Sequence, residues 1–125
     1  MSDDIRKVLI LDDDEMVGIL LETVARLDGM ATQLTASSDD FFAALDTWQP
    51  THLVIDLTMP GMSGEDVLRE VARRGCQARI VIASGDDGQR MQAALALAHT
   101  LGLQSAQPLA KPFLPVQLRT LLATD

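Results

Sequence analysis

Short apolar runs alternate along this chain with segments whose apolar residues recur at helical spacing. Three of the runs are continuous: Val8–Leu11, Leu53–Ile55 and Ile80–Ala83. Continuous runs of this length are typical of strands that are covered on both faces of a parallel sheet. Two weaker strands are expected at sheet edges. Met30–Thr35 alternates apolar with polar residues, and Gln107–Ala110 contains Pro108, which cannot donate a hydrogen bond to a neighbouring strand.

Helical stripes fill the intervals between the strands. The first helix is expected to bury one stripe of apolar residues: Met16, Ile19, Leu20, Val24 and Leu27. Gly29 follows in the position of a left-handed helix cap. A second stripe lies between Ser38 and Pro50, and a third begins at Ser63, whose hydroxyl can cap the helix.

Two further helices are expected, at roughly Gln89–Leu101 and Leu114–Ala123. The first should bury a stripe of five apolar residues: Met91, Ala94, Leu95, Ala98 and Leu101. Leu97 then points elsewhere, which predicts an apolar docking face for a partner or a second copy. The alternative is that the alanines of this segment are simply good helix formers.

The order strand then helix occurs five times, which predicts a doubly wound α/β fold with right-handed crossovers. The 125 residues fit a single domain spanning 1–125. Apolar residues make up 47% of the chain and aromatic residues only 3%, so the core must be aliphatic.

Polar side chains follow four of the expected strands. Asp12 and Asp13 follow the first strand, Asp56 ends the third, Ser84 the fourth and Lys111 the fifth. Because the carboxyl ends of parallel strands share one edge of the sheet, these side chains should converge there. Carboxylates held together repel one another and should recruit a cation, and their oxygen atoms suit Mg²⁺.

This grouping predicts phosphoryl chemistry. With a metal screening the negative charge, Asp56 can act as a carboxylate nucleophile, while Lys111 and Ser84 hold the other phosphoryl oxygens. Taken singly, each residue has a plainer explanation as a helix cap, a turn or a solvated loop. Their shared placement at strand ends favours a common site.

The remaining composition narrows the setting. The formal charge is −8, from 10 basic and 18 acidic residues, which disfavours direct contact with nucleic acid. A single cysteine, Cys76, suits a reducing compartment, and no leader or membrane-length apolar run is found, so a cytoplasmic protein is expected. His52 and His99 are expected to be surface residues without a function.

Four motifs resemble the receiver domains of two-component signalling, the CheY-like superfamily. They are Leu9–Asp14, Asp56–Gly64, Ala83–Gly85 and Lys111–Phe113, and the resemblance covers essentially the whole chain. It implies a flavodoxin-like fold with strand order 2-1-3-4-5. It also implies a signalling switch rather than an enzyme, in which a histidine kinase or a histidine phosphotransfer protein donates a phosphoryl group.

The resemblance assigns a role to each residue of the site. Asp56 would accept the phosphoryl group, and Ser84 and Lys111 would contact it. Asp13, Asp56 and the Thr58 carbonyl would bind Mg²⁺ directly, while Asp12 would act through water. Asp14 matches no ligand of the family and is interpreted as a helix cap. A cis bond before Pro112 is expected, and output through the fourth helix and fifth strand would use a partner or a homodimer.

Two alternatives remain. Pro108 stands where the family usually has an aromatic residue, which leaves open a pseudo-receiver that binds partners without phosphorylation. Asp12 and Asp14 also fit the first motif of haloacid-dehalogenase phosphohydrolases, although Met16 stands where that family has threonine. A phosphoryl group trapped on Asp56 rather than Asp12 would exclude the hydrolase.

Overall fold

A computed structural model describes residues 5–59, 61–85, 88–103 and 105–123, so that Pro60 of the second motif lies outside the described residues. Its elements are β1 Lys7–Leu11, α1 Glu15–Leu27, β2 Ala31–Thr35, α2 Ser38–Trp48, β3 His52–Asp56, α3 Gly64–Arg73, β4 Arg79–Ser84, α4 Gly88–Thr100, β5 Gln107–Ala110 and α5 Pro115–Leu122. The strands form one sheet in the order β2-β1-β3-β4-β5. Every neighbouring pair is parallel. The predicted fold class and strand order are confirmed.

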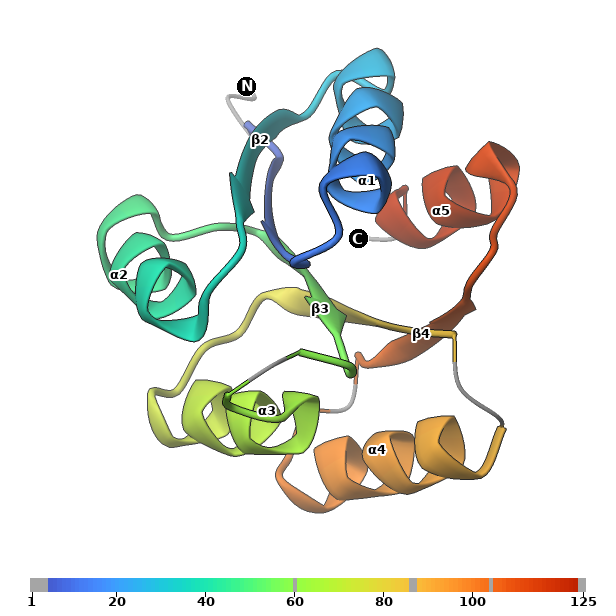
Figure 1. The fold of residues 1–125 in the computed structure, drawn as a ribbon. Coiled ribbons are helices and arrows are strands. Elements are labelled where there is room, and N and C mark those ends of the chain that lie inside the picture. Colours follow the sequence, from blue (N-terminus) through green and yellow to red (C-terminus); the bar gives the residue numbers. More distant parts are fainter. Residues whose placement is uncertain (1–4, 60, 86–87, 104, 124–125) are drawn as a thin grey trace.

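Helices cover both faces of the sheet (Figure 1). On one face α2, α3 and α4 pack over residues such as Leu11, Ile55 and Ile82. On the other face α1 and α5 pack over Val54 and Val81. The continuous apolar runs are explained by this arrangement, because successive strand residues point to opposite faces and both faces are buried.

The apolar stripe expected on α1 is wrong. Four of its five residues are exposed: Met16 at 81%, Ile19 at 52%, Leu20 at 41% and Leu27 at 82%. The buried face of α1 instead contains Gly18, Leu21, Val24 and Ala25. A Cβ atom at Gly18 would lie 2.8 Å from Leu34 Cδ1. The missing side chain therefore lets the helix approach β2 closely, and this approach fixes which side of the helix faces the core.

The stripe expected on α4 is confirmed. Ala94 and Ala98 are completely buried, and the larger apolar residues of the stripe pack against the same core. Leu97 is half-buried, whereas Ala93 and Ala96 are exposed. The α4 surface therefore offers less large apolar side-chain area than the docking prediction assumed.

Local details agree in part with the sequence. Asp14 caps α1 by accepting a hydrogen bond from the Val17 N–H at 3.2 Å, and Ser63 caps α3. Helix α2 begins at Ser38, and the Ser37 side chain caps it. The Lys111–Pro112 bond is cis, as expected.

His52 is 4% exposed, so the prediction that it is a surface residue is wrong. It is buried because it begins β3, a strand that is covered on both faces. Among the described residues, no helix has the length and hydropathy needed to cross a bilayer.

Candidate functional site

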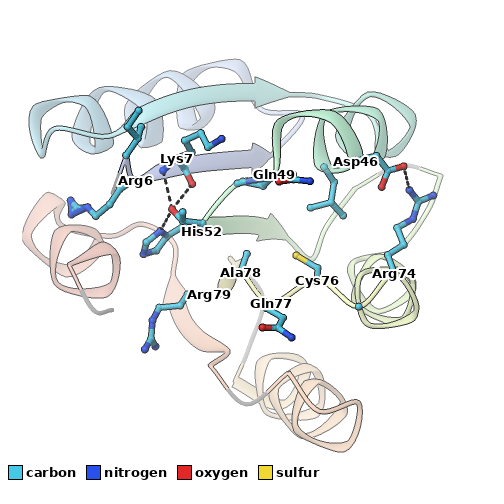
Figure 2. A pocket seen from close by; sticks show the side chains of 15 residues that line it. Arg6, Lys7, Asp46, Gln49, His52, Arg74, Cys76, Gln77, Ala78 and Arg79 are labelled. Carbon is cyan, nitrogen blue, oxygen red and sulfur yellow. Dashed lines mark hydrogen bonds and ion pairs between the residues drawn. The ribbon is translucent and has the colours of Figure 1, made fainter. Parts of the chain in front are cut away.

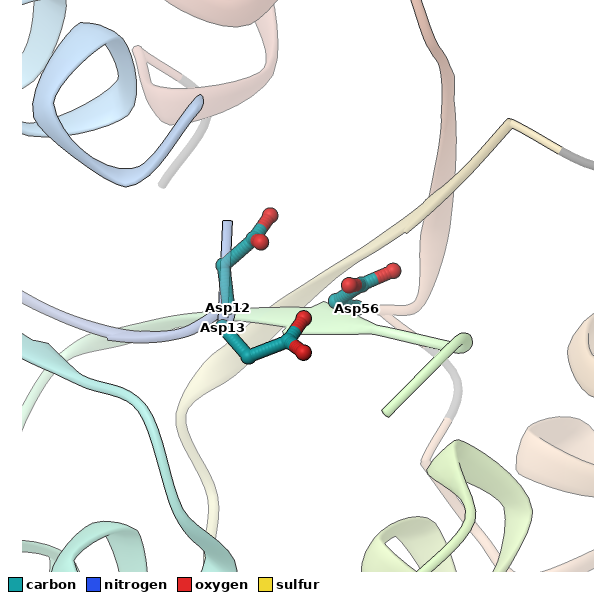
Figure 3. Close-up of side chains that lie close together, drawn as sticks. All are labelled: Asp12, Asp13 and Asp56. Carbon is teal, nitrogen blue, oxygen red and sulfur yellow. The ribbon is translucent and has the colours of Figure 1, made fainter. Parts of the chain in front are cut away.

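Three carboxylates meet at the carboxyl edge of the sheet (Figure 3). Asp12 and Asp13 follow β1, and Asp56 is the last residue of β3. One oxygen from each of the three lies within 4.8 Å of the others. Asp12 and Asp56 are buried, while Asp13 is exposed. The predicted convergence is confirmed for these three residues, and the exposed Asp13 leaves the cluster open to solvent on one side.

Lys111 joins this cluster from the loop directly after β5. Its Nζ atom donates a hydrogen bond to Asp12 Oδ2 at 2.9 Å and lies 3.4 Å from Asp56 Oδ1. Its backbone N–H donates to the Ser84 carbonyl at 2.9 Å, which fixes the position of the loop after β5. Residues 99 positions apart in the sequence are therefore in direct contact.

The loop after β3 holds the Asp56 carboxylate. The Thr58 N–H donates to Asp56 Oδ1 at 3.1 Å. The next residue after Asp56, Leu57, is fully buried and its N–H donates to the Ala83 carbonyl at 3.0 Å. Gly64 packs against this segment so closely that a Cβ there would lie 2.7 Å from Leu57 Cα. The Met-x-Gly part of the second motif thus has a packing reason, since only glycine leaves room for the loop.

Burial governs the charges of the site. Burial raises the pKa of Asp56 above its usual value, although the Thr58 N–H and the Lys111 ammonium act against this rise. Burial would lower the pKa of Lys111, but its hydrogen bond to Asp12 and the charges of Asp56 and Asp12 together raise that pKa. Lys111 therefore stays a cation, and its charge partly offsets the three carboxylates.

The donor set fits a hard divalent cation. Three carboxylates with a single ammonium leave an excess of negative charge, and carboxylate oxygens at this spacing are the ligands that Mg²⁺ prefers. Thr58 is exposed in the loop beside Asp56, and Ser84 is buried at the end of β4. All the predicted site residues therefore lie at one edge of the sheet.

Sequence reasoning missed two residues at this edge. Arg90, in the first turn of α4, donates to the Leu57 carbonyl at 2.7 Å and contacts the Thr58 hydroxyl at 3.3 Å. Glu65 of α3 forms an ion pair with Arg90 at 3.3 Å. The sequence does contain one indication of a role for Arg90, because it is the only Asp, Glu, Lys or Arg residue in α4.

A hollow lies at the opposite, amino-terminal edge of the sheet (Figure 2). Basic residues line it, but most of them already have partners. Arg6 pairs with Asp28, Arg74 pairs with Asp46, and Lys7 Nζ donates to the Trp48 carbonyl. This edge therefore has the opposite charge to the carboxylate site, and its cations mainly stabilise the chain itself.

Comparisons with known proteins give a consistent result. The model of the family described as response regulator receiver domain matches residues 8–123. The chain is 34% identical over 85 residues to response regulator protein TodT of Pseudomonas putida strain F1, a match that covers 68% of this chain and 37% of TodT. It is 28% identical over 107 residues to Regulator of RpoS of Escherichia coli K12, covering 86% of this chain and 30% of that protein. The chain thus spans about a third of the length of these relatives.

Solved structures share the fold. Chemotaxis protein CheY4 of Vibrio cholerae superposes with a TM-score of 0.82 at 18% identity, covering 94% of this chain and 96% of that one. A CheY-like response regulator receiver domain protein of Methanospirillum hungatei JF-1 gives a TM-score of 0.81 at 17% identity, covering 94% and 90%. At these identities the likeness supports the architecture alone.

Proposed function

The chain belongs to the response regulator receiver domain family, and from this premise we propose that Asp56 is the phosphoryl acceptor of a two-component or phosphorelay switch. The donor is a phosphohistidine of a histidine kinase or a histidine phosphotransfer protein. One observation carries the proposal: the buried Asp56 carboxylate lies beside Lys111 and within 4.8 Å of two further carboxylates at an open sheet edge. Receiver domains are signalling switches, so the reaction changes the protein itself rather than turning over a substrate.

The reaction requires an oxygen of Asp56 that is available to the phosphoryl group. Oδ1 accepts from the Thr58 N–H and lies beside Lys111, and among the described residues no hydrogen bond or ion pair is found for Oδ2. We therefore assign the attack on phosphorus to Oδ2. The new O–P bond forms as the P–N bond of the phosphohistidine breaks, and the bonding electron pair and a proton remain with the donor imidazole. Lys111 and the Ser84 hydroxyl then hold the transferred oxygens.

The same residues suit Mg²⁺, which the family binds at an acidic pocket. Asp13, Asp56 and the Thr58 carbonyl would bind the ion directly, and Asp12 would act through water. When bound, Mg²⁺ supplies the positive charge that lets a negative phosphoryl group approach three carboxylates. The Lys111 ammonium offsets only one of the three negative charges of these carboxylates. We therefore expect phosphorylation to depend on the metal.

A protein donor must also dock beside Asp56, and α1 offers a surface for it. Met16, Ile19 and Leu20 are exposed on the first two turns of α1, and the helix begins two residues after Asp13. Leu114 and Val116, at the start of the neighbouring α5, are exposed as well. Clustered exposed apolar side chains mark protein contact sites. We propose that the donor protein covers these five residues.

The output is proposed to leave through α4 and β5, by binding an effector or a second copy of the chain. Gln107, Pro108 and Ala110 are exposed on the edge strand β5, and Ala93 and Ala96 are exposed on α4. A charge of −8 disfavours direct binding to nucleic acid. Because a histidine kinase donates its phosphoryl group inside the cell, we propose that the protein acts in the cytoplasm.

The test is the mass of the intact protein after incubation with acetyl phosphate, with and without Mg²⁺. We expect the addition of one phosphoryl group that requires Mg²⁺ and is lost in Asp56→Asn. Asp14→Asn is the matched control, because asparagine also caps a helix and the group lies outside the cluster. If the unchanged protein gains no phosphoryl group and also fails to bind beryllofluoride with Mg²⁺, the pseudo-receiver alternative replaces this proposal. Labelling of Asp12 instead would favour the hydrolase.

A further inference from the structure

Arg90 links three segments around the phosphorylation site. It lies in the first turn of α4, and its Nη2 atom donates to the Leu57 carbonyl at 2.7 Å. Nη1 is 3.3 Å from the Thr58 hydroxyl. Nε and Nη2 each lie 3.3 Å from an oxygen of Glu65 on α3. One side chain therefore holds together α4, the loop after β3 and the start of α3.

These contacts differ from an ordinary surface ion pair, which contributes only about 0–1 kcal/mol. The Leu57 carbonyl belongs to a fully buried residue that directly follows Asp56. The arginine is one-third exposed, and Glu65 is one-quarter exposed. Burial acts to raise the pKa of Glu65, but the hydrogen bond and charge of Arg90, together with a backbone hydrogen bond and the charge of Arg69, lower that pKa. Glu65 therefore stays ionised and keeps the guanidinium aimed at the loop.

The loop connects Arg90 to the acceptor. The Thr58 N–H donates to Asp56 Oδ1 at 3.1 Å, and the Thr58 hydroxyl contacts Arg90 at 3.3 Å. A phosphoryl group on Oδ2 changes the charge of the carboxylate whose Oδ1 accepts the Thr58 hydrogen bond, and Arg90 contacts the same Thr58. The path from the reacting carboxylate to α4 thus passes through a single intervening residue.

The buried side chains of α4 are poorly suited to sense the site. Ala94 and Ala98 are its buried side chains, and both pack into the apolar core rather than against the carboxylates. Arg90 is also the only Asp, Glu, Lys or Arg residue of the helix. Arg90 therefore gives α4 a polar and charged connection to the site edge.

We propose that Arg90 is a positioning residue that couples the state of Asp56 to α4. By binding the Leu57 carbonyl and Thr58, Arg90 fixes the loop that orients the Asp56 carboxylate. When a phosphoryl group is added to Asp56, the same contacts move the amino-terminal turn of α4. Because coupling between two sites is reciprocal, whatever holds α4 also changes the affinity of the Asp56 site for a phosphoryl mimic. The coupling rests on the proposed function of Asp56.

The experiment follows backbone amide shifts by NMR during titration with beryllofluoride and Mg²⁺, which together mimic a phosphoryl group. In the unchanged protein, we expect amides near Asp56 and amides of α4 to shift with one midpoint. In Arg90→Met, the Asp56 region should still saturate, whereas the α4 shifts should fall by at least half. Arg69→Met on α3 is the control, because it removes an arginine whose ion pair is with the exposed Asp66 rather than with the loop after β3, so this variant should keep the full α4 response.

A second variant separates the loop contacts from the ion pair and remains informative if Arg90→Met does not fold. The charge swap Glu65→Arg with Arg90→Glu keeps an ion pair between α3 and α4 but places an acceptor where the Leu57 carbonyl needs a donor. We expect the α4 response to stay reduced. A full α4 response in Arg90→Met or in the swap would overturn the coupling and leave the proposed function intact. If the unchanged protein binds no beryllofluoride, the coupling is overturned, and the proposed function falls as well if acetyl phosphate adds no phosphoryl group.

Discussion

Helices α1 and α4 lie on opposite faces of the sheet, and both begin at the edge that holds Asp56 (Figure 1). On α1, large apolar side chains such as Met16 and Ile19 face solvent, and Gly18 faces the core. On α4 the small Ala94 and Ala98 face the core, and Arg90 reaches into the site edge. The difference fits the proposed division of roles, in which α1 offers a surface to the donor protein and α4 is connected to Asp56.

The largest effect is expected from enlarging the buried face of α4. In Ala98→Leu, the added atoms enter a site that is completely buried, so overpacking should cost about 1–3 kcal/mol of the free energy of unfolding. Denaturant unfolding measures this cost. Ala96→Leu adds the same atoms at an exposed position of the same helix and should change stability by less than about 0.5 kcal/mol. Equal effects of the two variants would mean that the assigned buried face of α4 is wrong.

The next effect concerns α1. Ile19→Asp should leave stability nearly unchanged, because the side chain is 52% exposed. It should slow phosphoryl transfer from a protein donor by at least about tenfold, which corresponds to about 1.4 kcal/mol of lost docking. The rate with acetyl phosphate should not change, since this donor has no surface to dock. Stopped-flow transfer assays give both rates.

Thr47→Asp on α2 is the control for this prediction. Thr47 is exposed, and α2 packs on the opposite face of the sheet from α1, so this variant should transfer from both donors at the unchanged rates. If Ile19→Asp slows transfer from acetyl phosphate as strongly as transfer from the protein donor, α1 affects the site itself and the division of roles fails.

The smallest effect concerns the charge of the acceptor. Since burial raises the pKa of Asp56, the folded protein binds a proton there more tightly than the unfolded chain does. Its ionised form therefore lowers stability above the folded pKa, and this cost disappears as the pH falls below the ordinary value of 3.8. Asp56→Asn should raise the melting temperature at pH 7, and the gain should shrink towards acid pH.

Thermal unfolding across this pH range measures the gain, with Asp14→Asn as the matched control at the cap of α1. A lower melting temperature for Asp56→Asn at pH 7 would mean that Lys111 and Thr58 compensate the burial completely.

The strands and the site could be predicted from the sequence because both depend on simple patterns. Buried parallel strands appear in the sequence as continuous apolar runs. The shared carboxyl edge of the sheet brings Asp12, Asp56 and Lys111 together independently of how the helices pack. The orientation of α1 could not be predicted in this way. Its apolar residues surround most of the helix, and the close approach of Gly18 to Leu34 selects the buried side.

Two other features depend on tertiary contacts. The burial of His52 follows from its place in a central strand, which the preceding Pro50 and Thr51 do not reveal. The contacts of Arg90 depend on the angle at which α4 meets the loop after β3, so its sequence shows only an isolated charge. Local patterns therefore predicted which side chains meet at the carboxyl edge of the sheet, and packing determined how the helices connect to them.

The most direct test of the central claim is to locate the modified residue. After incubation with acetyl phosphate and Mg²⁺, reduction with borohydride converts an aspartyl phosphate into homoserine, which peptide mass spectrometry can assign to one position. We predict homoserine at position 56 alone, and none when Mg²⁺ is removed. Homoserine at position 12 or 13 with Asp56 unchanged would contradict the account.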